Sequence, residues 1–367
     1  MPKINCSEEK AKPMNRPNPA RIDIQKMSGY TPGEQPDPSR PLTKLNTNEN
    51  PFPPPKAVLD AILSATKQNL RLYPEPSSIS VRQAAAKAYN LKPEQVIAGN
   101  GSDDLLTMVL RTFVGHKQLV TAPAPTYSLY ETLTKIQGGI FKDTPWPDDF
   151  SLPIDDLIKS NAQLIFVVRP NAPTGHVVPL ADIAKLCENA PGVVVLDEAY
   201  VDFAEDNGLS LLNDHDNLII TRTMSKSLGL AGLRVGLGFT NPTLAAEMHK
   251  VRDSYNLNRL SQAGAVAALD NLAAYKPGIA AIRNERSRVT IELQNRGFTV
   301  MDSQANFILA TVPKDTLNGE GWLNALRNKG YLIRYFGSDP RLADKIRITI
   351  GTKDEMDGFL QAVDELL

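Results

Sequence analysis

The stretch VVVLDEAYVDF (Val193–Phe203) decides the fold class of this chain. Its apolar residues run without interruption into Asp197, a pattern typical of a buried strand that is covered on both faces. In open α/β sheets, ligands bind beyond the carboxyl ends of such strands, which is where Asp197 stands. Because burying an acidic side chain alone is costly, Asp197 needs a cation or hydrogen-bond donors there. A single carboxylate suits a protonated ring nitrogen better than a metal, and a simple helix cap is the alternative interpretation.

Similar apolar runs occur on both sides of this stretch and alternate with helical patterns. The runs cover residues 94–100, 116–123, 162–168, 217–223 and 233–239. Helical spacing is found instead in residues 55–68 and 78–90. Strands that alternate with helices indicate a mostly parallel sheet with helices on both faces. We therefore expect a large three-layer α/β domain over residues 45–270.

The C-terminal part of the chain has its own pattern. Helical segments cover residues 278–297 and 354–366. Between them, YLIRYF (331–336) and KIRITIG (345–351) have the apolar runs of strands. We expect a second, smaller α/β domain over residues 271–367.

The beginning of the chain is rich in proline, with twelve of the 28 prolines in the first 55 residues. Proline fixes φ and removes a backbone donor, so residues 1–44 are predicted to form an extended N-terminal arm. The arm could be a disordered tail or could lie across a partner surface. Tyr30 stands in its turn-rich segment MSGYTPGEQ (27–35), and both a functional role and simple exposure are open for it.

Composition and charge exclude several classes of protein. The 367 residues carry a formal net charge of −1, which does not indicate binding to nucleic acid or to a membrane surface. No apolar stretch has the roughly 18 residues of a membrane-spanning helix, and residues 1–14 lack the apolar core of a signal peptide. Cys6, Cys187 and the four scattered histidines match no metal-binding or disulfide pattern. We expect a cytoplasmic globular enzyme without a metal.

Two further motifs contain residues suited to a phosphorylated cofactor. In GNGSDDLL (99–106), Ser102 and the free N–H groups of a helix start would bind a phosphate, although an ordinary capped glycine turn is the alternative. In NLIITRTMSKSLGLAGLRVGLGF (217–239), Lys226 follows a strand, and Arg234 comes eight residues later. A partly desolvated lysine can act as a nucleophile, and arginine with hydroxyls binds phosphate, whereas a solvated surface lysine is the alternative.

Together these features indicate pyridoxal 5′-phosphate as the cofactor. Asp197 would pair with the pyridinium nitrogen and keep the ring an electron sink. Lys226 would hold the cofactor aldehyde as an imine, with the phosphate near Arg234 and the start of the helix.

At this point the chain resembles a known family, the histidinol-phosphate aminotransferases, which are fold-type-I pyridoxal-phosphate aminotransferases of class I/II. The resemblance extends from GYTPGEQP to RITIGT, nearly the whole chain. The matching motifs are LNTNENPF (45–52), YPEP (73–76), GNGSDD (99–104), PTYSLY (125–130), PNAPTG (170–175), LDEAY (196–200), SKSLGLAGLRVG (225–236) and RITIGT (347–352).

The resemblance implies a role for each matching residue. Lys226 would be the Schiff-base lysine and the base that moves the Cα proton, Asp197 the partner of the ring nitrogen, and Tyr200 a donor to the phenolate oxygen. Tyr127 would stack on the ring face. The phosphate contacts implied in the same chain are Gly101, Ser102, Asp103, Thr223, Ser225 and Arg234. Tyr73 would reach the phosphate of the neighbouring subunit, which implies a homodimer with shared sites.

The substrates implied are a phosphorylated amino alcohol or amino acid and a 2-oxo acid. Arg347 resembles the arginine that binds the α-carboxylate, because planar bidentate recognition favours arginine over lysine. Further candidates for the amine donor and its phosphate are Tyr30, Asn48, Tyr255 and Arg334.

One motif departs from the family pattern, which has two consecutive asparagines before Pro-Thr-Gly. This chain has Asn171 followed by Ala172, so alanine stands where an asparagine would contact the ring oxygen. Either Asn171 makes that contact or Tyr200 makes it alone, and losing one hydrogen bond costs about 1 kcal/mol.

The resemblance implies transamination between L-histidinol phosphate and 2-oxoglutarate, giving imidazole-acetol phosphate and L-glutamate, a step of histidine biosynthesis. Alternatives on the same fold are an aromatic or other amino-acid aminotransferase and a threonine-phosphate decarboxylase, a lyase. A pyridoxal-phosphate-binding transcription regulator would need a DNA-binding domain, for which the predicted arm is too short and too neutral.

Overall fold

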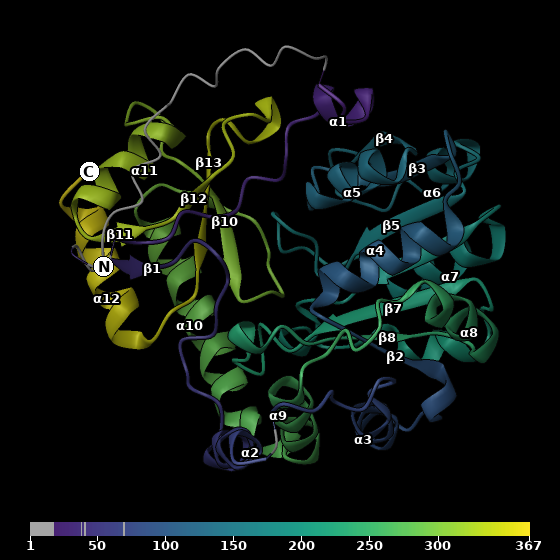
Figure 1. Ribbon diagram of the computed structural model, residues 1–367. Coiled ribbons are helices and arrows are strands. Elements are labelled where there is room, and N and C mark those ends of the chain that lie inside the picture. Colours follow the sequence, from purple (N-terminus) through teal and green to yellow (C-terminus); the bar gives the residue numbers. More distant parts are fainter. Residues whose placement is uncertain (1–17, 38, 40–41, 69) are drawn as a thin grey trace.

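A computed structural model describes residues 18–37, 39, 42–68 and 70–367 of the chain. Residues 1–17 of the predicted arm, with Cys6, lie outside the described residues. Figure 1 shows a large unit around one twisted sheet and a smaller unit that contains the C-terminus. Among the described residues, no helix has the length and apolarity needed to cross a membrane.

The large unit is built on a seven-stranded sheet of order β2-β8-β7-β6-β5-β3-β4. The strands are β2 (Val96–Gly99), β3 (Leu119–Ala124), β4 (Ile140–Pro145), β5 (Leu164–Val168), β6 (Val193–Asp197), β7 (Leu218–Thr223) and β8 (Gly236–Phe239). Only β8 runs antiparallel to its neighbours, and the other pairs are parallel. The expected mostly parallel sheet is confirmed.

Helices cover both faces of this sheet. The helices of this part of the chain are α2 (Lys56–Thr66), α3 (Ile79–Tyr89), α4 (Ser102–Phe113), α5 (Leu129–Gln137), α6 (Ile154–Lys159), α7 (Leu180–Asn189), α8 (Pro242–Val251) and α9 (Arg259–Asp270). Successive strand residues enter opposite cores: Ile165 and Val167 pack in one apolar cluster, whereas Leu164 and Phe166 pack in the other. Both faces are therefore buried, which explains the unbroken apolar runs and confirms the three-layer α/β prediction.

The smaller unit has an antiparallel sheet of order β12-β13-β10-β9 and one separate apolar core. Its strands are β9 (Thr299–Val300), β10 (Phe307–Thr311), β11 (Tyr331–Leu332), β12 (Arg334–Tyr335) and β13 (Lys345–Thr349). Its helices are α10 (Lys276–Asn295), α11 (Gly319–Asn328) and α12 (Lys353–Asp364). The prediction of a smaller α/β unit is confirmed.

The last residues of the arm join the smaller unit first. Strand β1 (Thr43–Lys44) pairs in parallel with β11 (Figure 1). Leu45 packs in the core of the smaller unit. The next residues, 46–50, then run toward the ends of β6 and β7 in the large unit. This crossing places backbone of the N-terminal segment between the two units. Before it, the short helix α1 (Ile22–Lys26) lies near α5.

Candidate functional site

The candidate site lies where β6 and β7 end, beside the start of α4 and the crossing segment 46–50. The carboxyl ends of parallel strands meet at one edge of a sheet, which brings Asp197 and Thr223 together. The crossing segment adds contacts to both units. The carbonyl of Thr47 accepts a hydrogen bond from Lys226 Nζ at 2.9 Å, and the carbonyl of Asn46 accepts one from Arg347 at 2.9 Å.

Asp197 is a buried carboxylate with two hydrogen-bond donors. Tyr130 donates its hydroxyl to Oδ2 at 2.6 Å, and the backbone N–H of Ala199 donates to Oδ1 at 3.1 Å. Burial raises the pKa of Asp197 to about 6. Among the ion pairs of the described residues, none includes Asp197. A buried carboxylate with a raised pKa and no cationic partner suits the protonated nitrogen of a ligand ring.

Lys226 lies in the loop that follows β7. Asn50 holds this loop by donating its side-chain amide to the carbonyls of Lys226 (3.0 Å) and Ser227 (2.9 Å). Burial lowers the pKa of Lys226 to about 8, and the positive charge of Arg347 contributes to this lowering. A larger share of unprotonated amine is then present near neutral pH, as a nucleophilic lysine requires.

A group of small and hydroxyl residues surrounds the guanidinium of Arg234. Arg234 donates to Ser225 Oγ at 3.3 Å and pairs with Asp103 at 3.3 Å, and Thr223 lies 3.0 Å from Ser225. Gly101 has φ +89°, and a Cβ there would collide with the guanidinium. Because α4 begins at Ser102, its unpaired N–H groups also lie at this position. The arrangement suits a phosphate.

Three tyrosines from different elements meet edge to face beside the site. Tyr127 lies 5.6 Å from Tyr130 and 6.0 Å from Tyr30, measured between ring centroids. The Tyr127 hydroxyl donates to Asp103 at 3.4 Å, and burial raises the pKa of Tyr127 well above its usual range. The described part of the arm thus brings Tyr30 against a residue of the large unit.

Arg334 and Arg347 stand directly opposite each other on β12 and β13. Both guanidinium groups lie over the ring of Phe336, at 5.5 and 5.2 Å from its centroid. Arg347 Nε is buried and has no hydrogen-bond partner among the described residues. Like charges opposed across a strand pair repel, so this arrangement favours an anionic ligand between them.

The other predicted residues fall into two groups. Asn48 lies inside the site and donates to the Tyr200 hydroxyl at 3.0 Å. Tyr73 and Tyr255 stack on each other with centroids 4.4 Å apart, and both are exposed. Among the described residues, the aromatic contact of Tyr73 is with Tyr255, and neither ring contacts Lys226.

Asn171 is buried, and its side chain is turned toward protein groups. Its amide donates to Thr174 Oγ1 at 2.7 Å and to the carbonyl of Pro125 at 3.2 Å. Its Oδ1 is buried without a partner in the described part of the chain, and Ala172 packs in the core of the smaller unit. A contact of Asn171 with a cofactor stays a prediction.

Several residues of the site were not singled out by the sequence analysis. Tyr130 stands three residues after Tyr127, within the motif PTYSLY, and belongs to α5, whereas Tyr127 precedes that helix. The LNTNENPF motif contains three more of these residues, Asn46, Thr47 and Asn50. The signal for them in the sequence was the high share of polar residues in this short motif. No pattern in the sequence indicated that their carbonyls and amides would reach Lys226 and Arg347.

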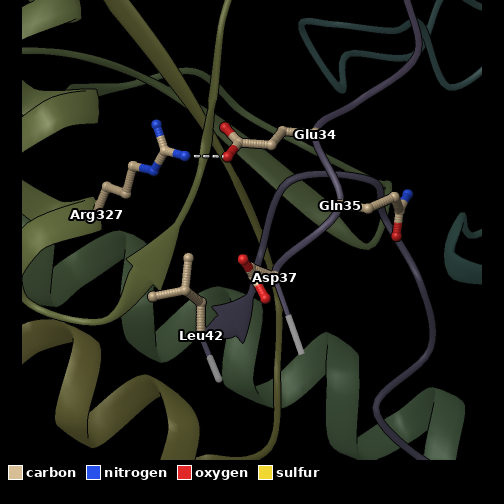
Figure 2. A pocket seen from close by; sticks show the side chains of 5 residues that line it. All are labelled: Glu34, Gln35, Asp37, Leu42 and Arg327. Atoms are coloured by element: carbon tan, nitrogen blue, oxygen red, sulfur yellow. Dashed lines mark hydrogen bonds and ion pairs between the residues drawn. The ribbon is translucent and has the colours of Figure 1, made fainter. Parts of the chain in front are cut away.

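A separate cavity of about 330 Å³ lies beside the arm (Figure 2). It is lined by Glu34, Gln35, Asp37, Leu42 and Arg327, and Glu34 pairs with Arg327 across it. None of the predicted site residues lines this cavity, so it is distinct from the candidate site around Lys226.

Comparisons with known proteins show the family. The family model "Aminotransferase class I and II" matches residues 40–363. A histidinol-phosphate aminotransferase of Microcystis aeruginosa is 44% identical over 349 residues, covering 95% of this chain and 99% of that relative. Histidinol-phosphate aminotransferase 1 of a Nostoc species is 43% identical over 347 residues, covering 95% of this chain and 98% of that relative.

Solved structures show the same fold. The histidinol-phosphate aminotransferase of Sinorhizobium meliloti, in complex with pyridoxal-5′-phosphate, superimposes with a TM-score of 0.87 at 27% identity. The match covers 96% of this chain and 98% of that one. A mutant aspartate aminotransferase of Thermus thermophilus matches with a TM-score of 0.81 at 19% identity, over 95% of this chain and 99% of that one, which supports the fold alone.

Proposed function

Because the chain belongs to the class I and II aminotransferase family, we propose that it is a histidinol-phosphate aminotransferase that uses pyridoxal 5′-phosphate. It transfers the amino group between L-histidinol phosphate and 2-oxoglutarate, a step of histidine biosynthesis. The names of the relatives at 44% and 43% identity support the substrate. The Sinorhizobium meliloti enzyme, whose structure is a complex with pyridoxal-5′-phosphate, supports the cofactor.

The site's own residues fit this cofactor. The buried carboxylate of Asp197 lacks a cationic partner among the described residues, as the pyridinium nitrogen requires. The space beside Gly101, which a Cβ would fill, adjoins Arg234 and the start of α4 and fits the phosphate. Lys226 is half-buried and its pKa is lowered. An amine that binds the aldehyde of the cofactor must be unprotonated, and the lowered pKa favours that form. When bound, the cofactor supplies an electron sink for negative charge at the substrate's Cα.

Each side chain then has a definite task. Asp197 keeps the ring nitrogen protonated, and Tyr127 would hold the ring from one face. Lys226 Nζ would be the base that takes up the proton from the substrate's Cα and later releases it. Gly101, Ser102, Asp103, Thr223, Ser225 and Arg234 are proposed to surround the phosphate. Asn171 and Tyr200 are proposed to lie at the ring oxygen.

The opposed pair Arg334 and Arg347 is the observation that carries the substrate proposal. L-Histidinol phosphate has a phosphate and no carboxylate, whereas 2-oxoglutarate has two carboxylates. Arg347, which is half-buried and acts electrostatically on Lys226, suits the carboxylate next to the reacting carbon. Arg334 would then bind the anionic group farther from the reacting carbon, which is the phosphate of L-histidinol phosphate or the second carboxylate of 2-oxoglutarate. Tyr30 and Tyr255 are proposed as further contacts of the amine donor.

The test is a two-step reaction with the purified holoenzyme. L-Histidinol phosphate should bleach the visible absorption of the bound cofactor, and 2-oxoglutarate should restore it with formation of glutamate. Release of carbon dioxide from threonine phosphate would indicate the lyase instead, and bleaching by aromatic amino acids alone would indicate another aminotransferase.

The two arginines should separate the two substrates. Arg347→Gln should raise KM for 2-oxoglutarate by about 10- to 100-fold, the size of a lost charged hydrogen-bonding contact, and raise it much less for L-histidinol phosphate. Arg334→Gln should raise KM for both. The control is Arg327→Gln, because Arg327 is exposed on the same unit and pairs with Glu34. Equal effects of both substitutions on both substrates would contradict this assignment.

We also propose that the enzyme is a homodimer. Several apolar side chains are about half exposed or more in one part of the large unit, namely Leu59, Leu63, Leu70, Leu72 and Tyr73. A gathering of exposed apolar side chains is typical of an interface. Tyr73 is 76% exposed and would then be free to reach the phosphate in the neighbouring subunit. A cytoplasmic location stays a prediction from the composition.

The dimer has a direct test. Sedimentation equilibrium should give twice the chain mass of 40.2 kDa. Leu63→Asp should shift the protein toward monomer, because it places a charge in the apolar contact. Ile291→Asp is the matched control, since Ile291 is similarly exposed but lies on α10. A monomeric wild type, or equal dissociation by both variants, would contradict the proposed interface.

A further inference from the structure

We propose that Asn48 and Thr349 are positioning residues for Tyr200, which fix the direction in which its hydroxyl donates. Asn48 then acts through Tyr200 rather than on the substrate. The inference rests on the proposed function, since Tyr200 is useful in this way only beside a bound cofactor.

The hydrogen bonds between Asn48 and Thr349 determine how the Asn48 amide is turned. The backbone N–H of Asn48 donates to Thr349 Oγ1 at 3.0 Å. The Thr349 hydroxyl has a single proton, and it lies 3.0 Å from Asn48 Oδ1. The Thr349 hydroxyl accepts from the backbone with one lone pair and donates its own proton to Asn48 Oδ1. The oxygen of the amide therefore faces Thr349 and the nitrogen faces away from it.

The amide nitrogen lies at the hydroxyl of Tyr200. Asn48 Nδ2 donates to this oxygen at 3.0 Å, and an NH₂ group cannot accept a hydrogen bond in return. The Tyr200 proton must therefore point away from Asn48. An edge contact with Phe307, with centroids 5.0 Å apart, restricts the ring.

The surroundings of Tyr200 show where its proton can go. The charged and titratable groups that act on the hydroxyl from the packed elements are Arg347, Asp197, Tyr30, Tyr127 and Tyr130. Lys226 Nζ lies 5.8 Å from the Tyr200 ring centroid. All of these residues belong to the candidate site. The Asn48 amide thus leaves the Tyr200 hydroxyl free to donate into the cofactor position, toward the ring oxygen.

Asn48 itself is firmly held. It is 1% exposed, and Asn306 donates to its carbonyl at 3.0 Å. Its φ of +56° lies in the left-handed region, which asparagine tolerates better than most residues. Thr349 follows Arg347 by two residues on β13. The strand that carries Arg347, the proposed substrate-binding arginine, therefore also orients the Tyr200 hydroxyl through Asn48.

The experiment compares Thr349→Val in two backgrounds, wild type and Tyr200→Phe. Valine keeps the shape of threonine and removes the hydroxyl, so the Asn48 amide is free to turn. The readouts are the pH at which the visible absorption of the bound cofactor changes, and kcat. A donor stabilises the ring oxygen as an anion, so weakening it should move that pH upward and lower kcat by about three- to tenfold, as for one hydrogen bond.

Two further variants control for disturbed folding. Thr349→Ser keeps the hydroxyl and should behave like wild type. Asn48→Gly tolerates the positive φ and should reproduce the shift seen with valine. Thermal unfolding and the dissociation constant of pyridoxal phosphate are measured for every variant.

The outcomes separate the inference from the proposed function. The inference holds if the pH shift in the wild-type background disappears in Tyr200→Phe, because both changes then act on the same hydrogen bond. It is overturned if the cofactor binds normally and Thr349→Val gives no shift, or the same shift in both backgrounds. If the wild type itself binds no pyridoxal phosphate, the proposed function fails instead.

Discussion

Replacing Lys226 by alanine is expected to lower kcat by about 10³-fold or more. The amine is the proposed partner of the cofactor aldehyde and the base that moves the Cα proton, and removing a positioned base alone costs about 10²- to 10⁴-fold. The visible absorption that depends on the covalent link should also be lost. Cofactor binding should persist at reduced affinity, because Asp197 and Arg234 are still present.

The matched control for this variant is Lys185→Ala. Lys185 is an exposed lysine of α7, and its replacement should leave kcat and the visible absorption unchanged. Equilibrium dialysis with pyridoxal phosphate measures binding apart from catalysis. If Lys226→Ala retained more than about a tenth of the wild-type kcat, Lys226 could not be the catalytic base.

Asp197→Asn is expected to weaken pyridoxal phosphate binding and to lower kcat/KM by about 10²- to 10³-fold. Removing one partner of a buried charge pair costs about 3–5 kcal/mol, since the ring cation would be left without its anion. Asparagine has nearly the same shape, so the fold should be retained. The control is Asp214→Asn, an exposed aspartate outside the site.

The same carboxyl predicts a pH dependence. Burial raises the pKa of Asp197 to about 6 in the protein without cofactor, so the group is neutral below that pH and cannot pair with a cation. The affinity for pyridoxal phosphate should therefore fall as the pH decreases through about 6. Tyr130 stabilises the carboxylate by donating to it, so Tyr130→Phe should move this midpoint upward. A midpoint that stays unchanged in Asp197→Asn would show that another group titrates.

Much of the fold could be predicted because the large sheet is buried on both faces. Strands such as β5 and β6 must then be apolar at every position, and that pattern is visible in a single sequence. Lys226 and Asp197 are predicted as site residues for a related reason, because each stands at or just after the end of such a strand. The crossing of segment 46–50 between the units could not be predicted, since two residues of β1 give no periodic signal.

In the candidate site, too, residues in a local motif can be predicted from the sequence, whereas contacts between residues far apart in the chain cannot. The sequence predicts Gly101 and Ser102 as phosphate contacts because a helix start is local in sequence. The contact of Tyr130 with Asp197 joins residues 67 positions apart, and that of Asn48 with Thr349 joins residues 301 positions apart. Neither residue type is unusual for a core, so only the packed structure identifies the partners.

The sequence by itself determined the fold class, the cofactor chemistry and the family, because these depend on apolar periodicity and on motifs that are continuous in the chain. Only the tertiary structure decided that Arg334 opposes Arg347, that Asn48 contacts Tyr200, and that Tyr130 holds Asp197. The physical reason is that hydrogen bonds and charge pairs act over a few ångströms in space. Which side chains come that close depends on how the units pack, and no local pattern records it.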